Sequence, residues 1–189
     1  HISTGALAAY NIACSIERLS LMLFTGLAGA CAIMVGNRIG AGEEHKARDY
    51  SKNFLFLSAV FSSVLAVILI IVRGYIVNFY NLTEQSNQYL YYLLLVISLI
   101  MVARVMNIIF QNGILRAGGD TLFGMIVELG GIWLVGVPLA AIAAFILKLP
   151  VYFVMAIAAT EEFVKMAAGF YRFLSNKWIH NLTKQTRSL

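Results

Sequence analysis

"GNRIGAGEEHKARDY", residues 36–50, is a glycine-rich, charged stretch between two long apolar runs. The run before it, residues 5–35, carries only two charged side chains. Glycine adopts the positive φ angles of tight turns without steric cost. We therefore expect Gly36, Gly40 and Gly42 to let two helices reverse direction within a few residues at a membrane surface.

A phosphate-binding loop is the alternative for this stretch. Such a loop needs a preceding strand and a GK[ST] ending, and the sequence has neither. Glu43 and Glu44 fall in the first turn of the next expected helix, where the helix dipole favours anions. Gly36 and Gly40 also have the spacing of small residues that lets helices approach closely. The stretch is therefore predicted to be architectural and not a substrate site.

Composition places the chain among membrane proteins. Of its 189 residues 60% are hydrophobic and 12% charged, which is about half the charged share of soluble domains. A transmembrane helix needs about 20 predominantly apolar residues, and five segments qualify: residues 5–35, 54–77, 89–112, 122–146 and 150–174. The predicted fold class is an all-α membrane protein, with a five-helix transmembrane bundle over residues 1–176 and a basic tail over residues 177–189.

The distribution of Lys and Arg predicts the orientation of this bundle. The connections on one side, together with the C-terminal tail, hold nine Lys and Arg residues, and those on the opposite side hold only Arg73 and Lys148. Because cytoplasmic loops carry the excess of positive charge, we expect the 36–50 stretch and the C-terminus in the cytoplasm. The protein is predicted to be multi-pass in a plasma membrane, a bacterial cytoplasmic membrane, with Trp178 in the interfacial aromatic belt.

The partners follow from the same charges. The net charge of +5 is explained by membrane topology, and no basic cluster with interleaved aromatic residues occurs. The lipid bilayer is therefore an expected partner, and nucleic acid is not.

Ionisable side chains within the expected spans are the candidate functional residues, because burying charge in a membrane is costly. Glu17 and Arg18 are neighbours that point about 100° apart on a helix, so each needs a partner on another helix. Arg104 has Asn107 and Gln111 at i+3 and i+7. These three form one polar stripe, which we expect to face the bundle interior.

Two further groups complete the candidate set. Glu128 lies about one and a half turns into the fourth span, at a depth judged comparable to that of Arg104, so an Arg104–Glu128 pair is expected. On the last span Glu161 and Lys165 have the i,i+4 spacing that favours an ion pair, and Glu162 is adjacent. The candidates for an ion or substrate path are Glu17, Arg18, Arg104, Asn107, Gln111, Glu128 and Glu161. Structural ion pairs that lock the bundle remain the alternative for all of them.

The sequence indicates neither catalysis nor a resident cofactor or metal. The three histidines, His1, His45 and His180, lie outside the expected spans. Cys14 and Cys31 are too far apart on one helix to bridge, and no CxxC pair or HExxH arrangement occurs. A membrane-embedded enzyme is therefore not expected.

Four stretches occur in the order found in one transporter family. The first, residues 6–52, is an apolar helix that ends in A-x-x-V-G-x-x-I-G-A-G at residues 32–42 and is followed by Ala47-Arg48. GILRAGGDTLFGM at 113–125, WLVGVPLA at 133–140 and EEFVKMAAGFYRFLSNKWIHNLT at 161–183 follow. The chain thus resembles helices eight to twelve of a multidrug and toxic compound extrusion (MATE) transporter.

This resemblance implies most of one six-helix lobe of a twelve-helix protein. The chain begins with His1 and not Met, and the first lobe and the seventh helix are expected to be missing partners. Gly118, Gly119 and Asp120 match the family's cytoplasmic turn between its tenth and eleventh helices, and are expected to be structural.

The resemblance also implies secondary active efflux, in which organic cations are exchanged for Na+ or H+ by alternating access. Coupling acids in the family lie in the first lobe or on the seventh and tenth helices. The span that matches the tenth, residues 89–112, has no acid, so no known cation site carries over to this chain.

Two alternatives to efflux remain. A lipid-linked oligosaccharide flippase shares the general architecture, but such proteins line their path with many cationic side chains. Here only Arg18, Arg104 and Lys165 are candidates for that lining. A non-transporting structural membrane subunit is the second alternative, which a carboxylate as central as Glu17 disfavours.

Overall fold

The computed structural model describes residues 4–80 and 82–180, and in these residues every regular element is a helix. The label η denotes a π-helical stretch, in which each backbone hydrogen bond joins residues five positions apart. In chain order the elements are α1 (Thr4–Gly40), α2 (Glu44–Phe79), α3 (Glu84–Ile108), η1 (Ile109–Leu115), α4 (Thr121–Gly130), η2 (Gly131–Gly136), α5 (Val137–Ala141), η3 (Ile142–Ile146), α6 (Val151–Ala158) and α7 (Thr160–Leu174).

Within residues 4–80 and 82–180, four continuous helical rods are long and apolar enough to cross a membrane. They span Gly5–Gly40, Glu44–Phe79, Glu84–Leu115 and Thr121–Ile146. Each of the first four predicted spans coincides with one of these candidate membrane helices, which extends beyond the predicted bounds. The fifth predicted span, residues 150–174, is interrupted at Ala159. Its two halves, α6 and α7, have 8 and 15 residues, so neither alone reaches the length of a span.

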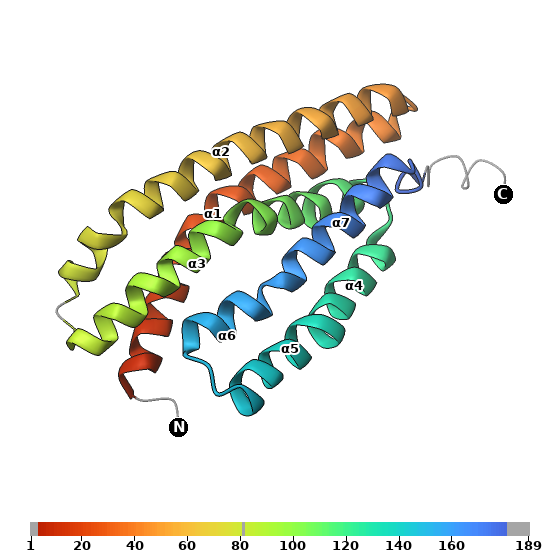
Figure 1. Cartoon of the computed structure of the whole chain (residues 1–189). Coiled ribbons are helices and arrows are strands. Elements are labelled where there is room, and N and C mark those ends of the chain that lie inside the picture. Colours follow the sequence, from red (N-terminus) through yellow and green to blue (C-terminus); the bar gives the residue numbers. More distant parts are fainter. Residues whose placement is uncertain (1–3, 81, 181–189) are drawn as a thin grey trace.

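The rods run up and down between two ends of the bundle (Figure 1). One end carries the turns that follow α1 and η1, and is called the Gly42 end. The other carries the turns that follow α2 and η3, and is called the Pro150 end. α6 and α7 lie between α3 on one side and the α4–η3 rod on the other (Figure 1).

The turn between α1 and α2 needs one glycine and not three. Gly36 and Gly40 lie within α1, so the prediction of turn geometry at these two positions is wrong. Gly42 has a φ of +78°, and the amides of Gly42 and Glu43 donate to the carbonyls of Ile39 and Arg38 at 3.0 and 2.9 Å. These two hydrogen bonds form the cap that is usual at a helix C-terminus when the residue after the helix has a left-handed conformation. Gly42 is that residue, so only Gly42 requires the absence of a side chain.

The predicted close helix approach at the same glycines is also weaker than expected. A Cβ added at Gly40 meets nothing within 4 Å, and one added at Gly36 only reaches the Cβ of Ala117 at 4.0 Å.

In the connection between η1 and α4, Gly119 has a φ of +80°. The prediction of a turn at Gly118–Asp120 is therefore confirmed.

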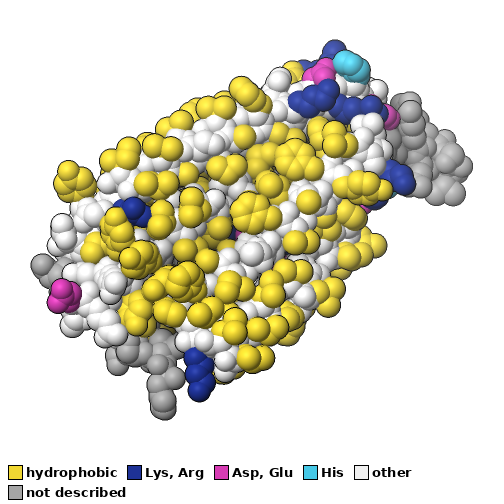
Figure 2. Space-filling view, in the orientation of Figure 1, with side chains coloured by type: hydrophobic (Ala, Val, Ile, Leu, Met, Phe, Trp, Pro, Cys, Tyr) yellow, Lys and Arg dark blue, Asp and Glu magenta, His cyan; other side chains and the backbone are white. Residues whose placement is uncertain are grey.

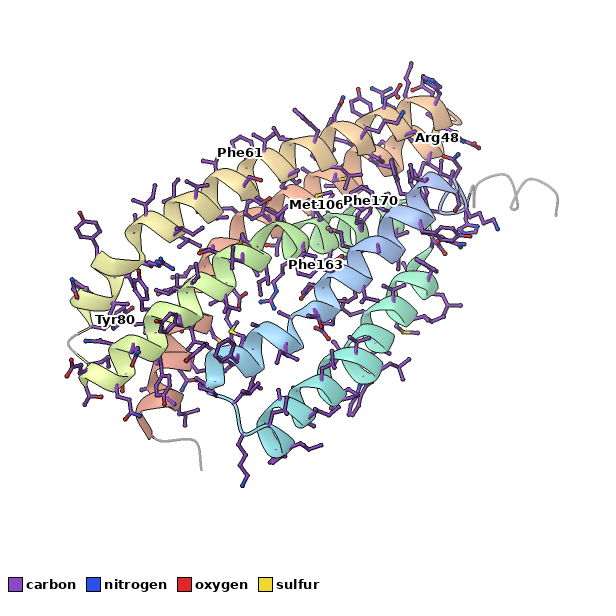
Figure 3. All side chains as sticks on the ribbon, in the orientation of Figure 1. Arg48, Phe61, Tyr80, Met106, Phe163 and Phe170 are labelled. Carbon is purple, nitrogen blue, oxygen red and sulfur yellow. The ribbon has the colours of Figure 1, made fainter. Side chains whose placement is uncertain are left out.

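The α3–η1 rod forms the centre of the bundle. In its most apolar stretch 67% of the residues are buried, against 22%, 28% and 17% in the other three rods. Met106 on α3 is buried in the core, whereas Phe61 on α2 points away from the bundle (Figure 3). Hydrophobic side chains cover the face shown in Figure 2, and Lys and Arg gather at the Gly42 end. This is the surface expected of helices that face lipid.

The segment after α7 folds back onto the connection between η1 and α4. The amide of His180 donates to the carbonyl of Gly118 at 2.8 Å, and Trp178 is 0% exposed with its ring stacked on Phe173. Trp178 is therefore buried against the bundle, where Gly118 has no side chain and lets the Trp178 backbone approach. Its place in an interfacial belt stays a prediction. Residues 181–189 of the predicted tail lie outside the described residues.

Candidate functional site

Arg104 on α3 lies between two carboxylates that come from different helices. Its Nη1 donates to Glu17 on α1, and its Nε donates to Oε1 of Glu162 on α7 at 3.1 Å. The side chains of Arg104, Glu17 and Glu162 are 24%, 9% and 7% exposed. One guanidinium therefore ties together three helices in the interior of the bundle.

Asn107 lies one turn along α3 from Arg104 and holds the same carboxylate. Its Nδ2 donates to Oε2 of Glu162 at 2.7 Å and to the backbone carbonyl of Glu162 at 2.8 Å. Both residues are buried. The predicted polar stripe on this span therefore does face the interior at Arg104 and Asn107.

Lys165 on α7 is surrounded by three carboxylates. Its Nζ lies 3.3 Å from Oε1 of Glu128, 3.4 Å from Oε1 of Glu161 and 3.4 Å from Oε2 of Glu162. The Glu161–Lys165 pair predicted from the i,i+4 spacing is thus confirmed. Gln111, in η1, donates from Nε2 to Oε2 of Glu128. Since Lys165 is only 4% exposed, its charge depends on these partners.

Two backbone features make room for this network. The interruption at Ala159 places Glu161 and Glu162 in the first turn of α7, where the dipole of a helix favours negative charge. Gly131 and Gly136 in η2 lie against the same side chains. An added Cβ would lie 2.7 Å from Cγ of Lys165 at Gly131, and too close to Glu161 at Gly136. The sequence pattern alone predicts no role for either glycine.

The predicted Arg104–Glu128 pair is wrong. Glu128 bonds Gln111 and Lys165, while Arg104 bonds Glu17 and Glu162. Gln111 lies seven residues beyond Arg104, which is about 10 Å along a helix at 1.5 Å per residue. Glu128 is therefore about two turns closer to the Gly42 end than Arg104. The sequence estimate failed because it placed both residues at one depth without a fixed starting point for either span.

Two cavities meet at Arg104. A polar cavity of about 400 Å³ is lined by Arg104, Asn107, Gln111, Glu128, Glu162 and Lys165. A largely apolar cavity of about 510 Å³ lies between α1, η2–α5 and α6, and has Glu17, Arg104 and Glu161 among its lining residues. Its volume is in the range of sites for small organic ligands. Arg104 lines both cavities, so its side chain belongs to the wall between them.

The network has more carboxylates than basic side chains. Its four carboxylates belong to Glu17, Glu128, Glu161 and Glu162, and its two basic groups to Arg104 and Lys165. With all six groups ionised the network carries a charge of −2, the sum of +2 and −4. Such a site attracts cations or protons in preference to anions.

The MatE family model matches residues 1–142 of the chain. The chain belongs to the MatE family. It is similar to the probable multidrug resistance protein YoeA of Bacillus subtilis (strain 168), with 26% identity over 179 residues. That match covers 94% of this MATE chain and 38% of YoeA.

A second relative is the multidrug resistance protein MdtK of Yersinia pseudotuberculosis serotype O:1b (strain IP 31758). It is 29% identical over 133 residues, which are 70% of this chain and 29% of MdtK. The MATE chain thus spans less than two fifths of the length of these curated relatives.

A solved structure has the same fold. The crystal structure of the eukaryotic MATE transporter AtDTX14 matches with a TM-score of 0.85 at 19% identity. The match covers 95% of this chain and 40% of AtDTX14. The family resemblance found in the sequence is therefore confirmed, and the helices of this chain have the arrangement of a part of a MATE transporter.

Six of the seven candidate residues of this MATE chain come together in the network. Arg18 is the exception. Its side chain is exposed, and within residues 4–80 and 82–180 it forms neither a hydrogen bond nor an ion pair. The predicted partner on another helix is therefore found for Glu17, as Arg104, and is not found for Arg18.

Glu162 was named among the ionisable residues of the last span but not among the candidates for the path. In the structure it is the side chain that joins Arg104, Asn107 and Lys165. The sequence gives a usable signal, because adjacent acids on a helix point about 100° apart. The side chains of Glu161 and Glu162 therefore have to face different neighbours.

Proposed function

We propose that this MATE chain forms part of a secondary active multidrug efflux transporter, which exchanges organic cations for Na+ or H+ by alternating access. The observation that carries the proposal is the excess of two carboxylates in a network beside an apolar cavity, buried at Glu17, Glu162 and Lys165 and 38% exposed at Glu128. Two basic groups shared among four carboxylates leave a net negative charge, which a proton, Na+ or a bound cation would balance, because uncompensated charge inside a membrane is costly. The names of YoeA and MdtK as multidrug resistance proteins support the same proposal.

A series of cavities supports a path through the lobe. A cavity of about 660 Å³ at the Pro150 end is lined by Gln85, Lys148 and Pro150, among others. It shares Val151 and Val154 with the apolar cavity, which in turn reaches Arg104. A cation that enters at the Pro150 end would pass Gln85 and Lys148, then the apolar walls, and reach the carboxylates last.

The opposite side of the network is filled by aromatic side chains. The ring of Phe110 lies 4.9 Å from that of Phe170, and Phe173 stacks on Trp178 with 5.8 Å between ring centroids. Phe110 also contacts Phe173, at 6.3 Å. On α7 these rings lie beyond Glu162 and Lys165 in the direction of the Gly42 end, so aromatic packing borders the network on that side.

The proposal includes the remaining parts of the transporter. The first lobe and the seventh helix supply the facing wall of the path, and α6 with α7 crosses the membrane as the fifth span. The Gly42 end and the C-terminus face the cytoplasm of a plasma membrane, as the excess of Lys and Arg at that end supports.

Labelling of single cysteines tests this orientation. The variants Lys46→Cys and Lys148→Cys are made in a background without Cys14 and Cys31, and intact cells are treated with a membrane-impermeant maleimide. We expect labelling at position 148 and not at position 46. The reverse pattern would place the Gly42 end outside the cell.

A flippase for lipid-linked oligosaccharides is not favoured. Its substrate is anionic, whereas the network has four carboxylates and two basic side chains. A structural subunit would have no need to bind small cations, which the following experiment also decides.

Binding by the purified chain in lipid nanodiscs tests the proposed function. Tetraphenylphosphonium, a lipophilic cation, is compared with the anion tetraphenylborate, which has nearly the same shape. Empty nanodiscs correct for partition into lipid. We expect the cation to bind at least about tenfold more tightly, a difference of about 1.4 kcal/mol. Na+ in place of choline at constant ionic strength, or a lower pH, is expected to weaken that binding. Equal binding of both probes, or binding that neither Na+ nor pH affects, would contradict the proposal.

A further inference from the structure

Arg104 holds its two carboxylates unequally. Glu162 receives hydrogen bonds from Arg104 and Asn107 and forms an ion pair with Lys165. For Glu17, in contrast, Arg104 is the only hydrogen-bond donor and ion-pair partner within the described part of the chain. Loss of Arg104 would therefore leave Glu17 alone and Glu162 still held by two other side chains.

The apolar cavity gives access to the weaker of these two contacts. Glu17 and Arg104 line it together, and its other walls include Leu7, Ile132 and Met155. These walls offer no charge to a ligand, so Glu17 and Glu161 are the anionic groups that a ligand reaches there. A large cation without hydrogen-bond donors fits both features, since apolar walls accept its surface and a carboxylate balances its charge.

We propose that Arg104 is a tethered counterion of Glu17, which a lipophilic organic cation in the apolar cavity displaces. The proposal rests on the proposed function and adds the residue with which the substrate competes. On displacement the guanidinium stays with Glu162, because its Nε contact to Glu162 does not involve Glu17. Glu17 exchanges one positive partner for another, so at no stage does it remain buried and unpaired.

The displacement has a second effect in the polar cavity. When the Arg104 guanidinium leaves Glu17 and remains at Glu162, it compensates more of the negative charge of the Glu162 carboxylate. Lys165 then depends more on Glu128 and Glu161, which lie at 3.3 and 3.4 Å from its Nζ. Positive charge thereby moves toward the polar cavity and disfavours a small cation in it. Coupling of two sites is reciprocal, so a cation in the polar cavity equally disfavours the organic cation.

Affinity for tetraphenylphosphonium in nanodiscs tests the role of Arg104. Removal of a competing counterion should tighten binding, so Arg104→Gln is expected to bind about tenfold more tightly than the unmodified chain. Glu17→Gln is expected to bind about tenfold more weakly. Arg38→Gln is the matched control, because it removes the same charge from an ion pair with a glutamate, Glu43, at the Gly42 end. Its affinity should equal that of the unmodified chain.

A double variant separates competition from simple charge repulsion. If Arg104 acts through Glu17, the gain from Arg104→Gln should fall to about twofold or less when Glu17 is already glutamine. An equal gain in both backgrounds would mean that Arg104 only repels the ligand at a distance, and would overturn the proposal. The double variant also lacks the unpaired Glu17, which makes it the least destabilised of the Arg104→Gln chains.

Arg104→Lys covers the case in which Arg104→Gln does not fold. Lysine keeps the charge, but its single ammonium matches carboxylate geometry less well than the guanidinium fork. We expect it to hold Glu17 less firmly and to bind the ligand about threefold more tightly. Binding by the unmodified chain without any gain in the Arg104 variants would overturn this inference and leave the proposed function intact. Absence of binding by the unmodified, helical chain would overturn both.

Discussion

Replacement of Gly118 by alanine is expected to dislodge the segment that follows α7. A Cβ at this position would clash with the backbone oxygen of Trp178 and lie 2.6 Å from Cε3 of its ring. A backbone carbonyl cannot rotate out of the way as a side chain does, so the whole segment has to shift. The φ of Gly118 is not in the left-handed region, so the expected effect comes from Trp178 alone.

The magnitude follows from what the segment buries. A tryptophan side chain buries about 150–250 Å², which at about 25 cal/mol per Å² is worth about 4–6 kcal/mol. The hydrogen bond from the His180 amide to Gly118 adds about 1 kcal/mol. Complete loss of docking is the upper limit, and overpacking that is partly relieved costs about 1–3 kcal/mol. We therefore expect the docked segment to lose about 2–4 kcal/mol.

Tryptophan fluorescence measures this loss directly. The chain has two tryptophans, and Trp133 is replaced by phenylalanine to leave Trp178 as the reporter. Gly118→Ala should shift the Trp178 emission to longer wavelength and increase its quenching by iodide. Gly124→Ala is the control, since its added Cβ makes only ordinary contact with Leu115 at 3.6 Å. An unchanged Trp178 emission in the Gly118→Ala protein would refute the steric argument.

Three further predictions concern the network and the turn at the Gly42 end. Glu162→Gln should lower the free energy of unfolding by about 2–3 kcal/mol in thermal denaturation. This is less than the usual cost of breaking a buried ion pair, because the basic partners of Glu162 keep other carboxylates. No loss of stability would mean that the network is not structural. Gly42→Ala should cost about 1–2 kcal/mol in the same assay, since its φ is +78°, and an unchanged midpoint would contradict the turn geometry. The hydrogen bonds from Lys46 and Arg38 lower the pKa of Glu43 below its usual value of 4.5. Its contribution to stability is therefore present above pH 4.5 and lost as the pH falls through the lowered pKa, and Glu43→Gln should remove that part of the acid dependence.

Apolar length and glycine position made most of the fold predictable. Each of the four long rods contains an apolar run that is long enough to recognise without reference to any partner. Gly42 was among the predicted turn residues for the correct reason, its positive φ. The sequence alone did not distinguish Gly36 and Gly40 from Gly42, because a glycine inside an apolar helix and a glycine in a turn look alike in the sequence.

The last predicted span shows where apolar length stops being sufficient. Residues 150–174 form one continuous hydrophobic segment with a few charges, yet the helix is interrupted at Ala159. Ala159 and Thr160 are residues that helices accept, so local propensity gives no warning. The interruption goes with tertiary packing, as Glu162 at the start of α7 contacts Arg104 and Asn107 on α3.

The network residues were predictable as a group, and their pairing was not. Charge inside an apolar span identified Glu17, Arg104 and Glu128 because the membrane makes such residues rare. Pairing depends on depth to within one turn and on helix rotation, and neither follows from a single span. The seven-residue offset between Arg104 and Gln111 decided which of them meets Glu128.

The two carboxylates in excess lie where the voltage across the membrane acts. Moving one elementary charge through 100 mV is worth about 2.3 kcal/mol. If the network releases one proton for each monovalent organic cation, its charge is the same in both states and voltage has no influence on the exchange. If it releases two ions, its charge changes by one, and voltage drives the cycle along with the ion gradient. Under the proposed exchange, four carboxylates against two basic groups would let this network balance two monovalent cations when all six groups are ionised, and the number released would decide the share of the energy that is electrical.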